Sequence, residues 1–243
     1  MLFRSVSMEV FFMEFLKIFA KAVDDGYGGK MYVPTTWGYV AVIAIIILAL
    51  VIASSFIVGK REKRVSAKQL AVSAICVALA FITSNIKLFS FPFGGTVTLL
   101  SMLFICLIGY WYGFGAGILT GVAYGMLQMI IDPYVLTLPQ LLVDYPLAFG
   151  ALGLSGIGYH FDKKHKYGGL LVGYICGVLG RYFFAFISGW IFFGTYAWKG
   201  WGAVTYSLAY NGAYLGAEAA ITIVIIAIPY VQRAFRHVKT MIY

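Results

Sequence analysis

The chain has 243 residues, of which 62% are hydrophobic and 11% are charged. A soluble domain of this length does not need so much apolar surface, so the composition excludes that class and indicates an all-α polytopic membrane protein. The net charge of +9 gathers in short basic segments between apolar spans. This pattern is typical of membrane topology and argues against a nucleic-acid-binding groove.

The N-terminal segment, residues 1–37, precedes the first apolar span. Met8, Phe12, Phe15 and Phe19 share one helical face, with the charged residues mostly on the other. The pattern predicts an amphipathic helix lying on the membrane surface, with a poorly ordered leader as the alternative. Residues 38–66 are predicted to contain an extra transmembrane helix and the basic linker that follows it.

Seven apolar spans follow one another along the chain. A bilayer core of about 30 Å requires about 20 apolar residues per helix. The first span, Gly38–Val58, is the extra helix, and the other six form a six-helix membrane domain over residues 67–232. We predict these six at Leu70–Ile86, Thr96–Ile108, Gly113–Ile131, Leu138–Tyr159, Gly169–Phe193 and Val204–Val231.

Basic residues set the orientation of the spans. Five lysines and arginines lie within residues 60–68, three lysines lie within 162–166, and the tail at 233–243 is also basic. With seven spans, all three clusters fall on the cytoplasmic side only if the N-terminus is outside and the C-terminus is cytoplasmic. We therefore expect a multi-pass protein of the cell membrane with that topology.

Glycines repeat at intervals of four residues in three spans: Gly117, Gly121 and Gly125; Gly169, Gly173 and Gly177; and Gly212 and Gly216. Small residues at this spacing allow helix backbones to approach closely in lipid. We therefore expect these glycines to serve helix packing.

Three ionisable residues, Asp144, Arg181 and Glu218, lie well inside the spans, where charges are costly and mark a site or an internal pair. Arg181 and Glu218 are predicted at similar depth, about 20 Å from the outer surface, and we expect them to form a structural ion pair. Asp144 is shallower and has no basic residue at its own depth. A cation arriving from outside could be its partner.

The expected neighbours of Asp144 are Tyr145, Tyr134, Tyr206 and Asn211. A carboxylate surrounded by aromatic rings suits an organic cation, because Coulomb attraction adds to cation–π contact and stacking. The alternative is an interfacial belt of tyrosine and tryptophan, which polytopic proteins commonly carry.

Catalytic chemistry is not expected. "GLSG" at 153–156 is similar to the serine motif of rhomboid proteases, but His160, His165 and His237 are all predicted in cytoplasmic loops or the tail. The sequence has no phosphate-binding "GxxxxGK[ST]" loop, no metal-ligand spacing and no filter-like loop. We therefore predict no enzyme activity, no bound metal and no cofactor in this chain.

Three longer stretches resemble a known family: "DYPLAF" at 144–149, "GRYFFAFISGWIFFGTYAWKG" at 180–200 and "YSLAYNG" at 206–212. They are similar to the thiamine-specific substrate-binding subunit, or S-component, of energy-coupling factor transporters, the ThiT family. "YGMLQ" at 124–128 and "YVLTLPQ" at 134–140 extend the resemblance, which covers roughly residues 68–231.

The resemblance implies a six-helix fold that captures thiamine from outside. It also implies a coupling module of one transmembrane coupling protein and two ATPase subunits, which use the ATP. The family's binding residues correspond to Asp144, Tyr145, Tyr134, Tyr206 and Asn211. Small residues on the first core helix, here Ala74 and Ala78, are implied to contact the coupling protein, with ordinary helix packing as the alternative.

The sequence departs from the family pattern at several positions. Ala185 stands where the family usually has histidine, Phe193 and Tyr124 replace tryptophans, and Asp144 is glutamate in some members. Tyr124 is nevertheless expected at the binding site, and Trp190 and Phe193 are candidates for the pocket wall, with lipid contact as the alternative for at least one of these two. The departures leave a thiamine precursor or analogue open as the ligand, and a stand-alone secondary transporter of an organic cation is the rival from another class.

Overall fold

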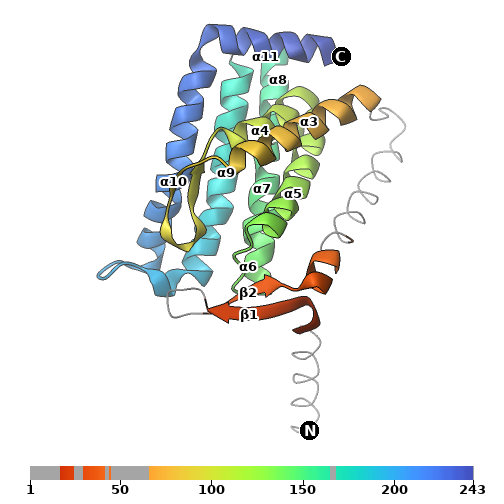
Figure 1. Cartoon of the computed structure of the whole chain (residues 1–243). Helices are drawn as coiled ribbons and strands as arrows, with labels where there is room; N and C mark the ends of the chain where they lie inside the picture. Colours follow the sequence, from red (N-terminus) through yellow and green to blue (C-terminus); the bar gives the residue numbers. More distant parts are fainter. Residues whose placement is uncertain (1–16, 25–29, 42–43, 45–65, 165–167, 243) are drawn as a thin grey trace, which may run out of the picture.

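The computed structural model describes residues 17–24, 30–41, 44, 66–164 and 168–242. Five helical segments are long and apolar enough to cross a membrane: Ala67–Ser84, Phe114–Ile131, Leu138–Asp162, Gly169–Phe192 and Ala203–Ala227. They confirm the predicted class of helical membrane protein. Figure 1 shows α10 (Ala203–Ala227) beside α9 (Gly169–Phe192), and α5 (Phe114–Ile131) beyond the segment that contains α7 (Ala148–Gly150), with α3 (Ala67–Ser84) crossing the bundle obliquely.

The third predicted span is a central helix rather than a lipid-facing one. Its first residues form a strand, β4 (Thr96–Thr98), and helix α4 begins only at Ser101 and ends at Tyr112. All of its residues except Phe104 and Tyr112 are buried by other elements. A helix surrounded by protein need not span the hydrocarbon core, and this explains the short apolar run in the sequence.

The fifth predicted span is irregular. It consists of α6 (Leu138–Leu142), a π-helical turn η2 (Val143–Leu147), α7 (Ala148–Gly150), a 3-10 segment η3 (Ala151–Gly156) and α8 (Ile157–Lys164). Pro146 lies inside the π-helical turn, where it cannot donate a backbone hydrogen bond. π-helical turns inside helices frequently occur at functional sites, and this one carries Asp144 and Tyr145.

Glycines of α5 and α9 pack closely against neighbouring elements. A methyl group at Gly117 or Gly121 would overlap backbone atoms of Gly109, Gly153 or Phe149, and one at Gly173 would overlap the carbonyl oxygen of Ser155. The packing prediction is confirmed for the glycine series of α5 and α9. It is wrong for α10, because Gly216 has no heavy atom within 4 Å of such a methyl group and Gly212 makes only ordinary contacts.

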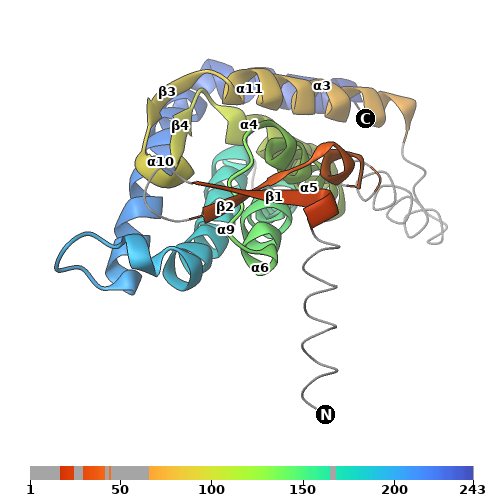
Figure 2. The ribbon, with the colours of Figure 1, turned by 60° about the horizontal axis from the view of Figure 1, so that its bottom comes forward.

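Two β-hairpins, which the span pattern did not predict, lie toward one end of the bundle. β1 (Ala20–Asp24) pairs antiparallel with β2 (Lys30–Pro34), and β3 (Lys87–Ser90) pairs with β4 through a 3-10 turn, η1 (Pro92–Gly94). Figure 2 shows β1 and β2 crossing this end of the bundle. Of the predicted surface helix, residues 1–16 lie outside the described residues, and β1 begins directly after Phe19. Most of the predicted extra helix at 38–58 also lies outside them.

The last predicted span ends earlier than expected. α10 stops at Ala227, and Pro229 begins a separate helix, α11 (Pro229–Ile242), which includes most of the basic tail. Figure 1 shows α11 lying across the end of the bundle opposite β1 and β2. The Trp111 indole donates a hydrogen bond of 3.1 Å to the carbonyl oxygen of Phe235, which fixes α11 to α4.

Candidate binding site

A cavity of about 210 Å³ lies among the β3–β4 hairpin, α4, α5, η2, α9 and α10. It brings together six of the eight residues predicted to bind a ligand: Asp144, Tyr145, Tyr134, Tyr206, Asn211 and Phe193. Gln128, Ala148 and Phe149 complete one side of the wall. An ion pair between Lys87 and Asp132, with 2.7 Å between Nζ and Oδ2, also borders the cavity.

Asp144 is the carboxylate of the π-helical turn. Its Oδ2 accepts a hydrogen bond of 2.5 Å from the side-chain amide of Gln140, one helical turn earlier. An ionised carboxylate has about four lone-pair sites, so this bond leaves most of its acceptor capacity unused. The protein therefore orients the carboxylate. The carboxylate can still accept hydrogen bonds from a ligand and can lie close to a positive charge on it.

Aromatic rings form the outer wall of the cavity. Tyr134 stacks on Phe193 with 5.8 Å between ring centroids and 25° between planes. Tyr206 lies 5.5 Å from Tyr210 with a 30° tilt. Tyr145 supports the first pair from behind, because its hydroxyl accepts a 2.8 Å hydrogen bond from the Tyr134 backbone N–H. Flat rings presented in this way can stack on a planar heterocycle.

Asn211 is buried and is held by its own helix. Its Nδ2 donates to the carbonyl oxygen and hydroxyl of Ser207 at 2.9 and 3.1 Å, and its Oδ1 accepts from the Tyr214 hydroxyl at 3.0 Å. A carbonyl oxygen has two lone pairs, so Oδ1 can accept one more hydrogen bond from a ligand N–H.

The β3–β4 hairpin covers the cavity. Phe93, Gly94, Gly95 and Thr96 line it, and Phe93 packs on Tyr196 with 4.7 Å between centroids. Tyr210 holds the hairpin in place: its hydroxyl accepts a 2.9 Å hydrogen bond from Gly95 N–H and donates to the carbonyl oxygen of Pro92. Access to the cavity from this end therefore depends on the hairpin.

The predicted ion pair between Arg181 and Glu218 is not present among the ion pairs of the described residues. Both residues are described, and no nitrogen of Arg181 lies within 4.0 Å of the Glu218 carboxylate. Instead, the Arg181 guanidinium lies 4.0 Å from the centroid of the Phe149 ring. The Glu218 carboxylate is occupied by four hydrogen bonds from residues between β4 and the start of α4: Thr98 N–H, Thr98 hydroxyl, Ser101 hydroxyl and Met102 N–H.

Two predicted binding residues lie outside the cavity wall. Trp190 is 47% exposed and stacks on Phe186 at the outside of the bundle. The cavity is lined on α9 by Arg181, Ala185, Ser188 and Gly189, and directly after the helix by Phe193. Trp190 is not among the lining residues. Tyr124 is fully buried behind Phe149, at 5.3 Å between centroids, and donates to the carbonyl oxygen of Ala80.

The sequence did not indicate four of the residues that line the cavity, namely Tyr210, Phe93, Tyr214 and Ser188. It also did not indicate Gln140, which lies outside the lining and donates a hydrogen bond to Asp144. Tyr210 could have been found, because it follows Tyr206 by one helical turn and so shares its face. Among the residues described, no group of three His, Cys, Asp or Glu side chains could hold a metal ion.

The comparisons with known proteins decide the family. A family model described as "Thiamine transporter protein (Thia_YuaJ)" matches residues 70–237. This chain belongs to the ThiT family of thiamine transporters. It is a membrane protein of a transporter family, not of an enzyme family.

Two curated ThiT relatives support the assignment. The chain is 36% identical over 156 residues to the thiamine transporter ThiT of Bacillus subtilis, covering 60% of this chain and 80% of the relative. It is 30% identical over 168 residues to ThiT of Lacticaseibacillus paracasei, covering 65% and 82%. A solved structure of ThiT from Listeria monocytogenes matches with a TM-score of 0.57 and 28% identity, covering 66% of this chain and 91% of that one.

Proposed function

We propose that this chain is the substrate-binding membrane subunit of an ATP-driven energy-coupling factor importer and that it captures thiamine from outside the cell. The observation that carries the proposal is the oriented Asp144 carboxylate beside the stacked Tyr134 and Phe193 rings. Membership of the ThiT family supports it.

The charges of the cavity suit a single positive charge. Asp144 and Glu218 contribute two carboxylates and Arg181 one guanidinium, while Lys87 and Asp132 neutralise each other. Two negative charges and one positive charge leave one net negative charge, which the thiazolium ring of thiamine would balance. In this account Asp144 faces the thiazolium, the aromatic rings stack on the flat heterocycles, and Asn211 accepts a hydrogen bond from the aminopyrimidine.

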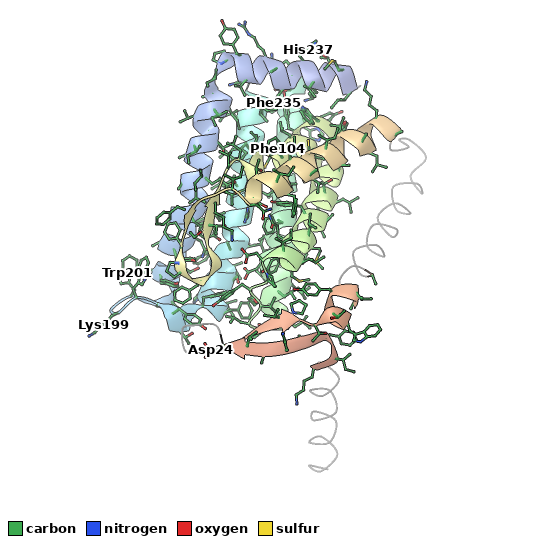
Figure 3. All side chains as sticks on the ribbon, viewed as in Figure 1. Asp24, Phe104, Lys199, Trp201, Phe235 and His237 are labelled. Atoms are coloured by element: carbon green, nitrogen blue, oxygen red, sulfur yellow. The ribbon has the colours of Figure 1, made fainter. Side chains whose placement is uncertain are left out.

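The proposed orientation places the cavity's covered end outside and the C-terminus in the cytoplasm. Figure 3 shows Lys199 and Trp201 at the end of the bundle opposite Phe235 and His237 of α11. α11 carries Arg233, Arg236 and Lys239, and α8 ends with Lys163 and Lys164 at the same end of the bundle, which supports the positive-inside assignment.

The coupling partners would bind at α3. Only Cys76, Ala80 and Ser84 of this helix are buried, whereas Ala74 and Ala78 are exposed beside Leu70, Ile75 and Leu79. Exposed small residues flanked by large apolar ones offer a groove to another membrane helix. Ala78→Leu should abolish thiamine uptake by cells that contain the coupling protein and ATPases while leaving thiamine binding by the purified chain intact. Loss of binding together with uptake would refute the partner role.

The experiment that tests the proposed function is calorimetric titration of the purified chain with thiamine. Asp144→Asn should weaken binding by at least tenfold, since a charge-assisted contact is worth about 1.5–3 kcal/mol. Unchanged affinity would remove Asp144 from the site. Uptake by cells that lack the coupling module would instead favour a stand-alone transporter.

A further inference from the structure

Gln140 is only 1% exposed, and both N–H groups and the oxygen of its side-chain amide form hydrogen bonds. Its Oε1 accepts a 2.9 Å hydrogen bond from the backbone N–H of Leu136. Its Nε2 donates to the carbonyl oxygen of Tyr134 at 3.0 Å and to Asp144 Oδ2 at 2.5 Å. The Gln140 side chain therefore connects the backbone of Tyr134, an aromatic residue of the cavity wall, with the Asp144 carboxylate.

The amide of Gln140 has only one workable orientation. Reversing it would place Oε1 against the carbonyl oxygen of Tyr134 and the Asp144 carboxylate, and would bring Nε2 against the N–H of Leu136. All three contacts would become repulsive. Because the amide cannot turn, the direction of its second N–H is fixed, and this N–H determines where Asp144 Oδ2 lies.

The local sequence brings the two side chains together. Thr137 begins α6, with its hydroxyl accepting a 3.3 Å hydrogen bond from Gln140 N–H. Gln140 and Asp144 are four residues apart, so they lie on the same side of the helix, across the junction between α6 and the π-helical turn. The Asp144 carboxylate, itself a cavity-lining group, is thereby held from the side away from the ligand.

We propose that Gln140 is a positioning residue. Its hydrogen bonds hold the Asp144 carboxylate in the orientation that faces a cationic ligand and link that orientation to the backbone of Tyr134 in the cavity wall. The inference rests on the proposed function and goes beyond it, because Gln140 does not touch the ligand. It predicts that Gln140 contributes to the preference for charged over neutral ligands, and not only to the stability of the fold.

The test compares two ligands on the full chain in detergent: thiamine and a neutral analogue with a benzene ring in place of the thiazolium. The ratio of their dissociation constants measures the preference for positive charge. Gln140→Met, which has nearly the same size but no hydrogen-bonding amide, should lower this preference at least fivefold. In an Asp144→Asn background, Gln140→Met should change the preference by less than about twofold.

Thr137→Val is the matched control, because it removes the cap of α6 and leaves Asp144 and Gln140 in place. It should lower the unfolding temperature without changing the preference for the cation. If Gln140→Met weakens both ligands by the same factor, Gln140 is merely structural and the inference is overturned. If the wild-type chain shows no preference for thiamine over the neutral analogue, the proposed role of Asp144 fails, and that of Gln140 fails with it.

Discussion

Glu218 on α10 accepts two hydrogen bonds from Thr98 on β4, one from its backbone N–H at 3.0 Å and one from its hydroxyl at 2.7 Å. Ser101 and Met102, in the first turn of α4, donate to the other carboxylate oxygen. The N-terminus of a helix has unpaired N–H groups and a partial positive charge. Glu218 therefore caps α4 from a neighbouring helix and anchors the base of the hairpin that covers the cavity.

Replacing Glu218 with glutamine should destabilise the fold. The amide keeps one acceptor oxygen but turns its NH₂ group toward two of the four donors, and the charge is lost. Charge-assisted hydrogen bonds contribute about 1.5–3 kcal/mol each, so we expect a loss of at least about 2 kcal/mol, or about 4–8 °C in unfolding temperature. Thermal unfolding in detergent measures it. A shift below about 1 °C would contradict the capping role.

Arg181 and Glu218 should behave independently, because the structure does not join them. In a double-mutant cycle of Arg181→Met and Glu218→Gln, the two changes in unfolding free energy should add within about 0.5 kcal/mol. A coupling energy above about 1 kcal/mol would instead support the direct ion pair that residue depth alone predicts.

Tyr210→Phe should speed ligand release. The change removes the hydroxyl that contacts Pro92 and Gly95, so the hairpin would open more often. Loss of these two hydrogen bonds should raise the dissociation rate of thiamine about tenfold, measured by stopped-flow tryptophan fluorescence. Tyr182→Phe is the control, because its hydroxyl donates to the carbonyl oxygen of Leu208 and the residue does not line the cavity. Equal rates for the two variants would count against the role of Tyr210.

Lys239 on α11 gives the stability of the fold a measurable pH dependence. Burial lowers the pKa of Lys239 below its ordinary value of 10.5, although Asp162, 3.6 Å away, opposes the shift. Between the lowered folded value and 10.5, the unfolded chain binds more protons than the folded one, so stability should rise with pH in that alkaline window. Lys239→Met should flatten the rise in thermal unfolding measurements. An unchanged slope would show that other groups cause it.

The residues that line the cavity could be predicted from the sequence more accurately than the hydrogen-bond partners behind them. Depth along each helix follows from the rise per residue, so the sequence alone places Asp144, Tyr206 and Asn211 at one level. Depth does not fix the direction in which a side chain points around its helix. For that reason the sequence makes both Trp190 and Phe193 candidates for the cavity wall. In the structure Phe193 lines the cavity, whereas Trp190 lies on another face of α9 and is exposed.

The irregular segments could not be predicted from hydrophobic periodicity. The strand at Thr96–Thr98 lies inside an apolar run, and its pairing with β3 and its contact with Glu218 depend on residues distant in sequence. Because that strand and the first turn of α4 donate hydrogen bonds to the Glu218 carboxylate, Arg181 is not required as its partner. The π-helical turn at Asp144 contains Pro146 and packs against α5 and α9. Hydrophobic periodicity does not encode that packing.

The most direct test of the central claim is isothermal titration of the purified wild-type chain with thiamine, carried out beside the Asp144→Asn variant. We predict saturable binding of one thiamine per chain by the wild type and at least tenfold weaker binding by the variant. Absence of heat and of saturation at micromolar thiamine with the wild-type chain would contradict the account.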